Sequence, residues 1–310
     1  MRTINKILIS AFSVLLFVGI VLFPFSQANE SAEYKVELEK TTVFEPLRKY
    51  LVENGISNQF LDTLFSDSRI EYYPDIIVNR QKLPAYRNAD HSAKSNSKFH
   101  KYNLHSFINK YSNYFDKAWE KYGVDKESIC AVLYVETKFG KFIGDHYILN
   151  VWLSMAMADQ EFAIDKVKEY VERKYHYLPN KKRQYIKEYY INYSRRKAGR
   201  AKKELVILLK LYQEDKINVK NLTGSYAGAF GYPQFLPSSY AKYAVDGDNN
   251  GKIDLFTFPD AILSVGNFLQ NHGWSPQLYA QKKALRRYNN SERYVADVLD
   301  IARYFNQQPR

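Results

Sequence analysis

One helix in this sequence carries a carboxylate on its apolar side. Residues 125–140 read as a short helix whose apolar stripe passes through Ile129, Val132 and Leu133, and the next position on that face is Glu136. A carboxylate buried without a partner is costly when ionised, so its pKa rises and it stays protonated near neutral pH. A protonated glutamate is what general acid catalysis needs. The alternative is that Glu136 lies at the edge of the stripe and pairs with a Lys or Arg.

The ends of this helix carry their own signals. Asp125 is the expected N-cap, and Glu127 places negative charge in the first turn. Lys138 and Lys141 lie at the other end, where Gly140 is expected to close the helix in a left-handed conformation.

A second segment, residues 224–243, is rich in aromatic side chains and holds three glycines and two prolines. This composition excludes one continuous helix and predicts a loop. Tyrosine and phenylalanine faces stack on sugar rings while amides and hydroxyls bind sugar hydroxyl groups, so the segment suits a glycan groove. A tightly packed structural loop is the alternative.

A third segment, residues 246–254, has the spacing of a calcium loop. Oxygen-bearing side chains occupy its positions 1, 3, 5 and 9, and glycine occupies position 6, as at the front of an EF-hand. The pattern departs at position 12, where Thr257 replaces the bidentate glutamate, and Asp260 follows three residues later. We expect a structural Ca²⁺ site; the alternative is a turn rich in Asp and Asn.

Composition limits the classes of partner and cofactor. The chain has 310 residues, a net charge of +12, 45% hydrophobic and 16% aromatic residues, which indicates a globular protein with an affinity for anions. No nucleic-acid-binding motif is present, and no organic cofactor is expected. The single cysteine, Cys130, excludes an intramolecular disulfide and a cysteine-based metal site.

The N-terminal residues 1–28 read as an export signal. Arg2 and Lys6 precede an apolar run from Ile7 to Phe25, and Ser26-Gln27-Ala28 suits a signal peptidase. The run is also long enough to span a bilayer as an N-terminal membrane segment if it is not cut. We therefore expect a periplasmic or cell-envelope protein that touches the inner membrane only through this segment.

The rest of the chain reads as mainly α. Amphipathic patterns predict helices within 41–80, over 103–121, over 147–158 and over 259–272, and a last helix capped by Ser291. Residues 159–215 are rich in Lys, Arg, Glu and Tyr and predict a helical hairpin broken at Leu178-Pro179-Asn180, ending in a long helix.

The ordered motifs resemble the lytic murein transglycosylase B family, glycoside hydrolase family 103. They are the Tyr-Val-Glu-Thr-Lys-Phe-Gly segment ending at Gly140, the aromatic loop from Gly224, the acidic loop, and Arg-Arg-Tyr-Asn-Asn-Ser ending at Ser291. The resemblance covers most of 41–305. It implies a lysozyme-like catalytic core with additional helical lobes and an EF-hand-like calcium loop.

The resemblance also implies the reaction. The family cleaves the β-1,4 bond between N-acetylmuramic acid (MurNAc) and N-acetylglucosamine (GlcNAc) in peptidoglycan and leaves a 1,6-anhydro-MurNAc end. One glutamate, here Glu136, acts first as acid and then as base, because the sugar's own C6 hydroxyl is the nucleophile. Two alternatives stay open: a non-catalytic peptidoglycan-binding or scaffold protein, and a muramidase, which would need a second carboxylate.

By the same resemblance, other residues acquire expected roles. The substrate-binding set is Ser225, Gln234, Tyr288, Asn289, Tyr294, Arg196 and Lys197, and the calcium ligands are Asp246, Asp248, Asn250, the Lys252 carbonyl and Asp260. Lys197 replaces the second basic residue of the family's pair and cannot form a planar clamp as Arg can. The implied domain spans 29–305 with a helical insertion at 159–194 and a tail at 306–310. Glycan strands are the expected partner, with wall-synthesis or remodelling proteins as possible others.

Overall fold

The structure, a computed structural model, describes residues 42–77 and 104–307, and these residues are mainly helical. The helices are α2 (Glu45–Glu53), α3 (Asn58–Phe65), α5 (Leu104–Lys110), α6 (Ser112–Tyr122), α7 (Lys126–Thr137), α8 (Ile148–Ala156), α9 (Glu161–Lys174), α10 (Asn180–Gln213), the 3₁₀ helix η4 (Val219–Asn221), α11 (Pro237–Tyr243), α12 (Phe258–Asn271), α13 (Leu278–Tyr288) and α14 (Glu292–Gln307). The strands are β1 (His146–Tyr147) and β2 (Thr223–Gly224). The predicted mainly α class is confirmed.

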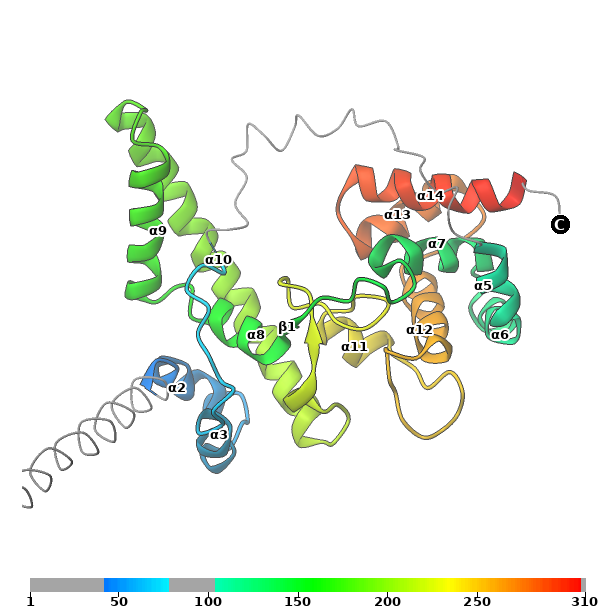
Figure 1. The fold of residues 1–310 in the computed structure, drawn as a ribbon, viewed down its shortest axis with the longest axis horizontal. Coiled ribbons are helices and arrows are strands. Elements are labelled where there is room, and N and C mark those ends of the chain that lie inside the picture. The colour runs from blue at the N-terminus through cyan, green and yellow to red at the C-terminus, as the bar shows by residue number, and fades with distance from the viewer. Residues whose placement is uncertain (1–41, 78–103, 308–310) are drawn as a thin grey trace, which may run out of the picture.

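A long helix, α10, organises one half of the molecule. It runs for 34 residues after Pro179 and packs against α8, α9 and α11. With α9 it forms the predicted hairpin, which projects from the upper left of the molecule in Figure 1. The hydroxyl groups of Tyr175 and Tyr190 lie 3.0 Å apart inside this hairpin, and both tyrosines are buried.

The other half is built around α7 and α12. Helix α14 packs along α7, and α12 packs against α6, α7 and α13 (Figure 1). Gly266 lets α12 approach α6 closely, since an added Cβ would lie 2.9 Å from the Tyr122 ring. Helix α7 is almost wholly buried, which holds its last turn in a fixed place.

The two halves meet at a small antiparallel sheet. In it, His146 of β1 lies opposite Gly224 of β2. Gly144 packs so tightly here that an added Cβ would lie 2.2 Å from the Gly224 carbonyl oxygen. The aromatic loop, residues 224–236, starts from β2 and leads into α11, which contacts both α10 and α12.

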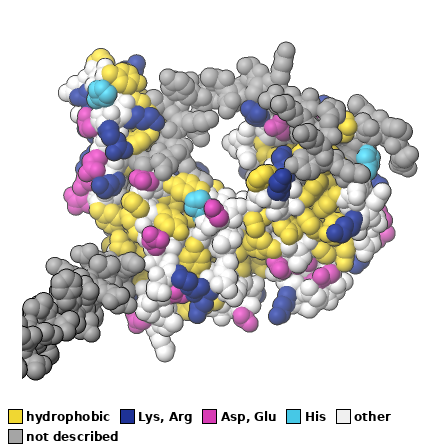
Figure 2. Space-filling model, viewed as in Figure 1, with side chains coloured by type: hydrophobic (Ala, Val, Ile, Leu, Met, Phe, Trp, Pro, Cys, Tyr) yellow, Lys and Arg dark blue, Asp and Glu magenta, His cyan; other side chains and the backbone are white. Residues whose placement is uncertain are grey.

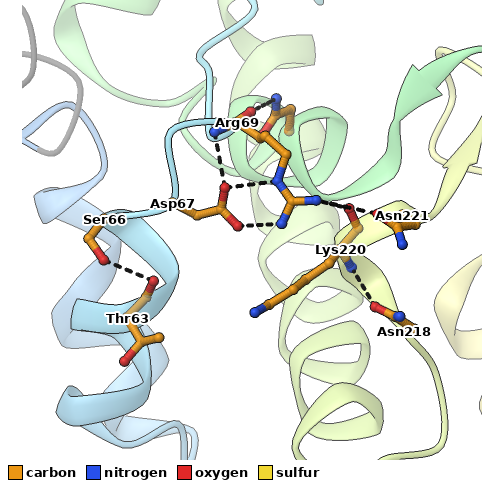
Figure 3. A network of polar contacts seen from close by, with 8 residues as sticks. Thr63, Ser66, Asp67, Arg69, Asn218, Lys220 and Asn221 are labelled. Carbon is orange, nitrogen blue, oxygen red and sulfur yellow. Dashed lines mark hydrogen bonds and ion pairs between the residues drawn. The ribbon is translucent and has the colours of Figure 1, made fainter.

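The N-terminal lobe, α2, α3 and residues 66–77, is tied to the rest of the molecule by Arg69 (Figure 3). The guanidinium pairs with Asp67 through both carboxylate oxygens, at 2.9 and 2.5 Å, and donates to the Lys220 carbonyl at 2.6 Å. From α8, the Asn150 amide donates to the Arg69 carbonyl at 2.9 Å, and the Ser154 hydroxyl accepts from the Tyr73 N–H at 2.8 Å.

The structure corrects four predicted element boundaries. Residues 237–243, predicted as part of the aromatic loop, form helix α11, which begins with Pro237 at a position where a helix tolerates proline. The helix expected over 103–121 is two helices, α5 and α6, with a break at Tyr111. Helix α13 lies between the helix predicted over 259–272 and the one capped by Ser291, where no helix was predicted. Helix α7 ends at Thr137, and Lys138, not Gly140, is its left-handed C-cap.

Several predictions lie outside the described residues. These are the export signal at 1–28 and the end of the chain after 307. Among the helices of residues 42–77 and 104–307, none combines the length and apolar character needed to cross a membrane.

Candidate active site

Glu136 lies in the last turn of α7, where its side chain is half-buried. Burial raises the pKa of Glu136 to about 7. The ion pairs of the described residues include none with Glu136, so the alternative of a Lys or Arg partner is wrong there. About half of such carboxyl groups are protonated at neutral pH, as acid–base chemistry requires.

Two tyrosines face this carboxyl group. Tyr294 of α14 and Tyr288 at the end of α13 stack with ring centroids 6.1 Å apart. Burial and the Glu136 charge raise the pKa of both phenols well above the usual range, so both stay protonated. The Tyr294 hydroxyl is close enough to lower the pKa of Glu136 slightly, although it makes no hydrogen bond of good geometry within the described residues. It is therefore a donor aimed at the acid.

The backbone after Glu136 is unusual. Lys138, Phe139 and Gly140 all have positive φ, at 51°, 57° and 80°, and the first two are not glycine. The chain turns sharply here, and the Phe139 ring is held by Phe107 of α5, with centroids 4.0 Å apart. Sequence reasoning placed the left-handed turn at Gly140 alone and missed its two preceding residues.

Thr137 joins this turn to the aromatic loop. Its hydroxyl, buried to 1% exposure, donates to the Tyr232 carbonyl at 3.0 Å and accepts from the Gly140 N–H at 3.0 Å. The sequence did not single out Thr137 as a site residue. The sequence feature that could have identified it is a polar hydroxyl residue next to Glu136, at a helix position where an apolar residue is expected.

The aromatic loop is fastened to the site at further points. The Tyr288 hydroxyl donates to the Pro233 carbonyl at 2.5 Å. The Gln234 amide donates to the carbonyls of Ile143 and Gly231, at 3.2 and 2.9 Å, and Gln234 itself has φ 51°. The loop thus has fixed contacts with the segment after α7 and with α13.

Ser225 opens the same loop. Its hydroxyl oxygen accepts from the N–H groups of Ala227 and Ala229, both at 3.2 Å. Because the oxygen is used twice as an acceptor, its own proton remains to be donated. Gln234 is the converse: its N–H₂ is used, and its carbonyl oxygen is the group left to accept.

The remaining predicted substrate residues are Asn289, which directly follows Tyr288, and the basic pair on α10. Asn289 is exposed just beyond α13, where its N–H donates to the Leu285 carbonyl at 2.9 Å. Arg196 is exposed on α10, and the Lys197 ammonium lies 5.7 Å from the Tyr193 ring centroid. The structure therefore brings together Glu136, Tyr288 and Tyr294 and places the basic pair on another helix.

The acidic loop gathers three of its five expected ligands. Carboxylate oxygens of Asp246, Asp248 and Asp260 lie within 4.8 Å of one another, while Asn250 and Lys252 lie on the same loop and are exposed. Asp260 is fully buried at the start of α12 and accepts from the N–H groups of Gly247 and Asp254, at 2.8 and 2.6 Å.

This donor set fits a hard cation. All three side chains offer oxygen, and the described residues supply no Lys or Arg that pairs with them. The like charges of Asp246 and Asp248, added to burial, raise the pKa of Asp260. A divalent ion would relieve this repulsion and would be held by Asp246, Asp248 and Asp260.

Two cavities of the described residues lie away from Glu136. One of about 770 Å³ lies between the end of α10, the second half of α11 and residues 251–256, and one of about 360 Å³ lies between α6 and the acidic loop. Neither is lined by Glu136, so the candidate site rests on the clustered side chains and not on cavity volume.

Comparison with known proteins is consistent with this arrangement. Residues 39–283 match the family model described as the transglycosylase SLT domain. Membrane-bound lytic murein transglycosylase B of Escherichia coli (strain K12) is 35% identical over 168 residues, which cover 54% of this chain and 37% of that protein. The alignment thus spans little more than a third of the relative's length.

Solved structures agree on the fold. The E. coli lytic transglycosylase SLT35 in complex with calcium superposes with a TM-score of 0.60 at 22% identity, covering 85% of this chain and 91% of that chain. SltB3 of Pseudomonas aeruginosa, in complex with NAG-anhNAM-pentapeptide, gives a TM-score of 0.61 at 18% identity, covering 86% and 79%. These likenesses confirm the lysozyme-like fold. Because the family model matches most of its length, the chain belongs to the transglycosylase SLT domain family.

Proposed function

We propose that this protein is a lytic transglycosylase that cleaves the β-1,4 bond between MurNAc and GlcNAc in peptidoglycan and leaves a 1,6-anhydro-MurNAc end. The observation that carries the proposal is Glu136: a carboxyl group in a transglycosylase-family chain, with a pKa raised to about 7 by burial and two protonated tyrosines beside it. An acid of this pKa can both give and take a proton near neutral pH.

The reaction needs two proton transfers at one carboxyl group. Protonated Glu136 gives its proton to the glycosidic oxygen, and the bond from that oxygen to C1 of MurNAc breaks. The resulting carboxylate takes the proton of the C6 hydroxyl, whose oxygen forms the new bond to C1. No water is added, and Glu136 ends protonated. Because the nucleophile belongs to the same sugar, proximity replaces a second catalytic carboxylate.

The neighbouring side chains suit supporting roles. Tyr294 donates toward Glu136 while it is ionised, and this stabilises the intermediate carboxylate. Ser225 and Gln234 present a donor and an acceptor from one rigid loop. We propose these residues with Tyr288, Asn289, Arg196 and Lys197 as the substrate-contacting set.

The muramidase alternative asks for a second carboxylate near the first. Within the described residues, burial and Tyr294 account for the shift in the pKa of Glu136, and no carboxylate contributes. This favours the single-carboxylate reaction. The scaffold alternative is disfavoured because a protein that only binds glycan gains nothing from burying an acid at a cost in stability.

We also propose that Asp246, Asp248, Asn250, the Lys252 carbonyl and Asp260 hold a structural Ca²⁺. Support comes from the carboxylate cluster and from a relative of this fold solved with calcium. When bound, the ion supplies positive charge that holds the acidic loop on α12. It has no part in the proton transfers.

For the whole chain we propose an exported cell-envelope protein. Residues 1–28 are its signal or N-terminal membrane segment, 29–305 its catalytic domain with an insertion at 159–194, and 306–310 a tail. The support is the apolar N-terminal run and the relative named as membrane-bound. Glycan strands are the proposed substrate and partner.

The test is mass spectrometry of soluble products from purified peptidoglycan. We expect 1,6-anhydro products, which lack one water relative to hydrolysed ones, and a loss of at least about a thousandfold in rate for Glu136→Gln with glycan binding retained. Reducing ends would instead indicate a muramidase. Binding without any products from the parent chain would favour the scaffold alternative.

A further inference from the structure

The positive charge of this protein is concentrated on one segment. Residues 173–203 contain twelve Lys and Arg and a single acidic residue, Glu188, a net charge of +11. The whole chain has +12, so the remaining residues are together almost neutral. This segment is the tip of the α9–α10 hairpin and more than half of α10, and Figure 2 shows Lys and Arg side chains along the hairpin.

The ion pairs of this segment lie on its inner side. Glu172 of α9 pairs with Arg183 and Lys187 of α10, at 2.7 and 2.5 Å, and Asp159 pairs with Lys202 at 2.5 Å. These pairs join α10 to its neighbours and leave the charges of its outer face uncompensated.

The outer face forms a line that we name the α10 track. It consists of Lys181, Lys182, Tyr185, Arg196, Arg200 and Lys203, all exposed. The helical repeat places them on one side of α10, and at 1.5 Å per residue they extend over about 33 Å. No carboxylate of the described residues pairs with a basic member of the track.

The track begins beside α11. Glu204, the residue after Lys203, caps α11 by accepting from the Ser238 N–H at 2.8 Å and the Ser238 hydroxyl at 2.7 Å. Helix α11 directly follows the loop that carries Ser225 and Gln234. From there the track runs outward, past Arg196, to the hairpin.

The shape of the track favours a polymer strand over a membrane. A helix that lies in a bilayer interface inserts an apolar face. Helix α10 has already buried its apolar face, including Ile186, Ala198 and Leu205, within the protein. Its outer face is narrow and basic, and Tyr185, 68% exposed, offers a ring on which a sugar can stack.

We propose that the α10 track is a second peptidoglycan-binding surface, which holds the carboxylates of the acidic peptide stems outside the catalytic groove. The proposal rests on the proposed function in taking peptidoglycan as the ligand. Its new element is the outer half, Lys181, Lys182 and Tyr185 on the hairpin, which extends the contact well beyond the cluster around Glu136. An extended contact of this kind would hold the enzyme on a polymer between cleavage events.

The test measures co-sedimentation of the full chain with insoluble peptidoglycan, in the Glu136→Gln background so that the polymer stays intact. The track variant combines Lys181→Gln, Lys182→Gln and Arg200→Gln. The control combines Lys49→Gln, Lys166→Gln and Lys168→Gln, which removes the same charge from α2 and α9. We expect the track variant to bind about tenfold more weakly and the control to bind like the parent.

Two further arms separate the explanations. Peptidoglycan stripped of its stems by an amidase should bind the parent and the track variant equally, and added salt should weaken the parent more than the track variant. The proposal is overturned if the track variant binds intact polymer like the parent, if the control loses as much, or if stem removal has no effect. It is also overturned if the track variant loses binding to anionic vesicles and not to peptidoglycan. Failure of the proposed function would appear separately, as absent anhydro products from the chain with Glu136 intact.

Discussion

The environment of Glu136 suits it to act as an acid and at the same time lowers the stability of the folded protein. Its side chain is half-buried and has no ion pair with the other described residues, and desolvation raises the pKa of the carboxyl group from 4.5 to about 7. The same burial that prepares a general acid makes the ionised form unfavourable in the folded protein. The cost depends on pH, which makes it measurable.

We predict that the parent chain loses stability relative to Glu136→Gln as the pH rises. Because the folded pKa lies above the unfolded value, the folded protein holds this proton between pH 4.5 and 7 after the unfolded chain has released it. The penalty is absent below about pH 4.5, grows up to about pH 7 and is then constant, with an upper limit of about 3 kcal/mol. Urea unfolding of both chains at several pH values checks this, and parallel stability curves would contradict it.

The contacts around Glu136 also mark what the sequence could reveal at this scale. Local spacing in the sequence predicted both Glu136 on the apolar side of α7 and Asp125 as the N-cap of that helix. The Asp125 carboxylate does accept a hydrogen bond from the Ser128 N–H at 2.8 Å. The bonds that fix the site join distant segments, as from Tyr288 to Pro233 or from Thr137 to Tyr232. Local periodicity carries no information about such pairs, and only the family resemblance pointed to Tyr288.

At the scale of elements, the end of α7 determines where Glu136 points. Gly140 has φ +80°, and an added Cβ would lie 2.5 Å from the Tyr232 ring. We predict that Gly140→Ala loses stability and activity together, because both the backbone and the aromatic loop must shift. Gly123, the C-cap of α6, is the matched control: its φ is +64° and nothing lies within 4 Å of its added Cβ.

Gly123→Ala should cost only the backbone strain, about 1 kcal/mol, and leave the rate of product formation near that of the parent. Thermal unfolding and the peptidoglycan assay compare the two variants. Equal effects at Gly123 and Gly140 would mean that the contact with Tyr232 does not matter.

The acidic loop is a second element whose order should depend on a ligand. We predict that chelation of Ca²⁺ lowers the melting temperature by several degrees and that Ca²⁺ restores it, because binding to the folded state alone stabilises it. Asp248→Asn should weaken this response, whereas Asp116→Asn, an exposed change on α6, should keep it. A melting temperature independent of chelator and Ca²⁺ would contradict the site.

Elements with clear caps and periodicity were predictable, and the exceptions have physical reasons. Helix α13 has few buried residues, Ala284 and Leu285, so its sequence reads as polar. The break between α5 and α6 falls within an aromatic-rich stretch where Tyr111 packs on Phe258, a contact from across the fold. Tertiary packing, not local pattern, sets both features.

At the scale of the whole molecule, the sequence predicted the fold class and the hairpin but not how the N-terminal lobe docks. Residues 66–77 lie in the stretch predicted as helical but form turns and irregular backbone, and both polar contacts and the buried side chains of Ile70 and Ile76 hold them in place. Arg69 makes the central polar contacts: it holds Asp67, the Lys220 carbonyl beside β2, and α8 through its own carbonyl (Figure 3). Because β2 leads directly into Ser225, the contact of Arg69 with the Lys220 carbonyl helps to fix the start of the aromatic loop.

We predict that Arg69→Met loosens the N-terminal lobe more than Arg48→Met does. Arg48 pairs with Glu45 and Asp62 inside the lobe, at 2.8 Å each, so its loss leaves the joint to the core intact. Limited proteolysis should therefore cut the Arg69→Met lobe faster, while Arg48→Met resembles the parent.

The attachment of the lobe through Arg69 should also weaken in acid. Arg69 lowers the pKa of Asp67 to about 2, from 3.8, so the pair contributes stability above about pH 4 that is lost as the pH falls toward 2. The difference in cleavage rate between the parent and Arg69→Met, followed with a protease active in acid, should accordingly persist at pH 5 and shrink toward pH 2. A difference that stayed constant through this range would assign the docking to the Lys220 contact and not to the pair with Asp67.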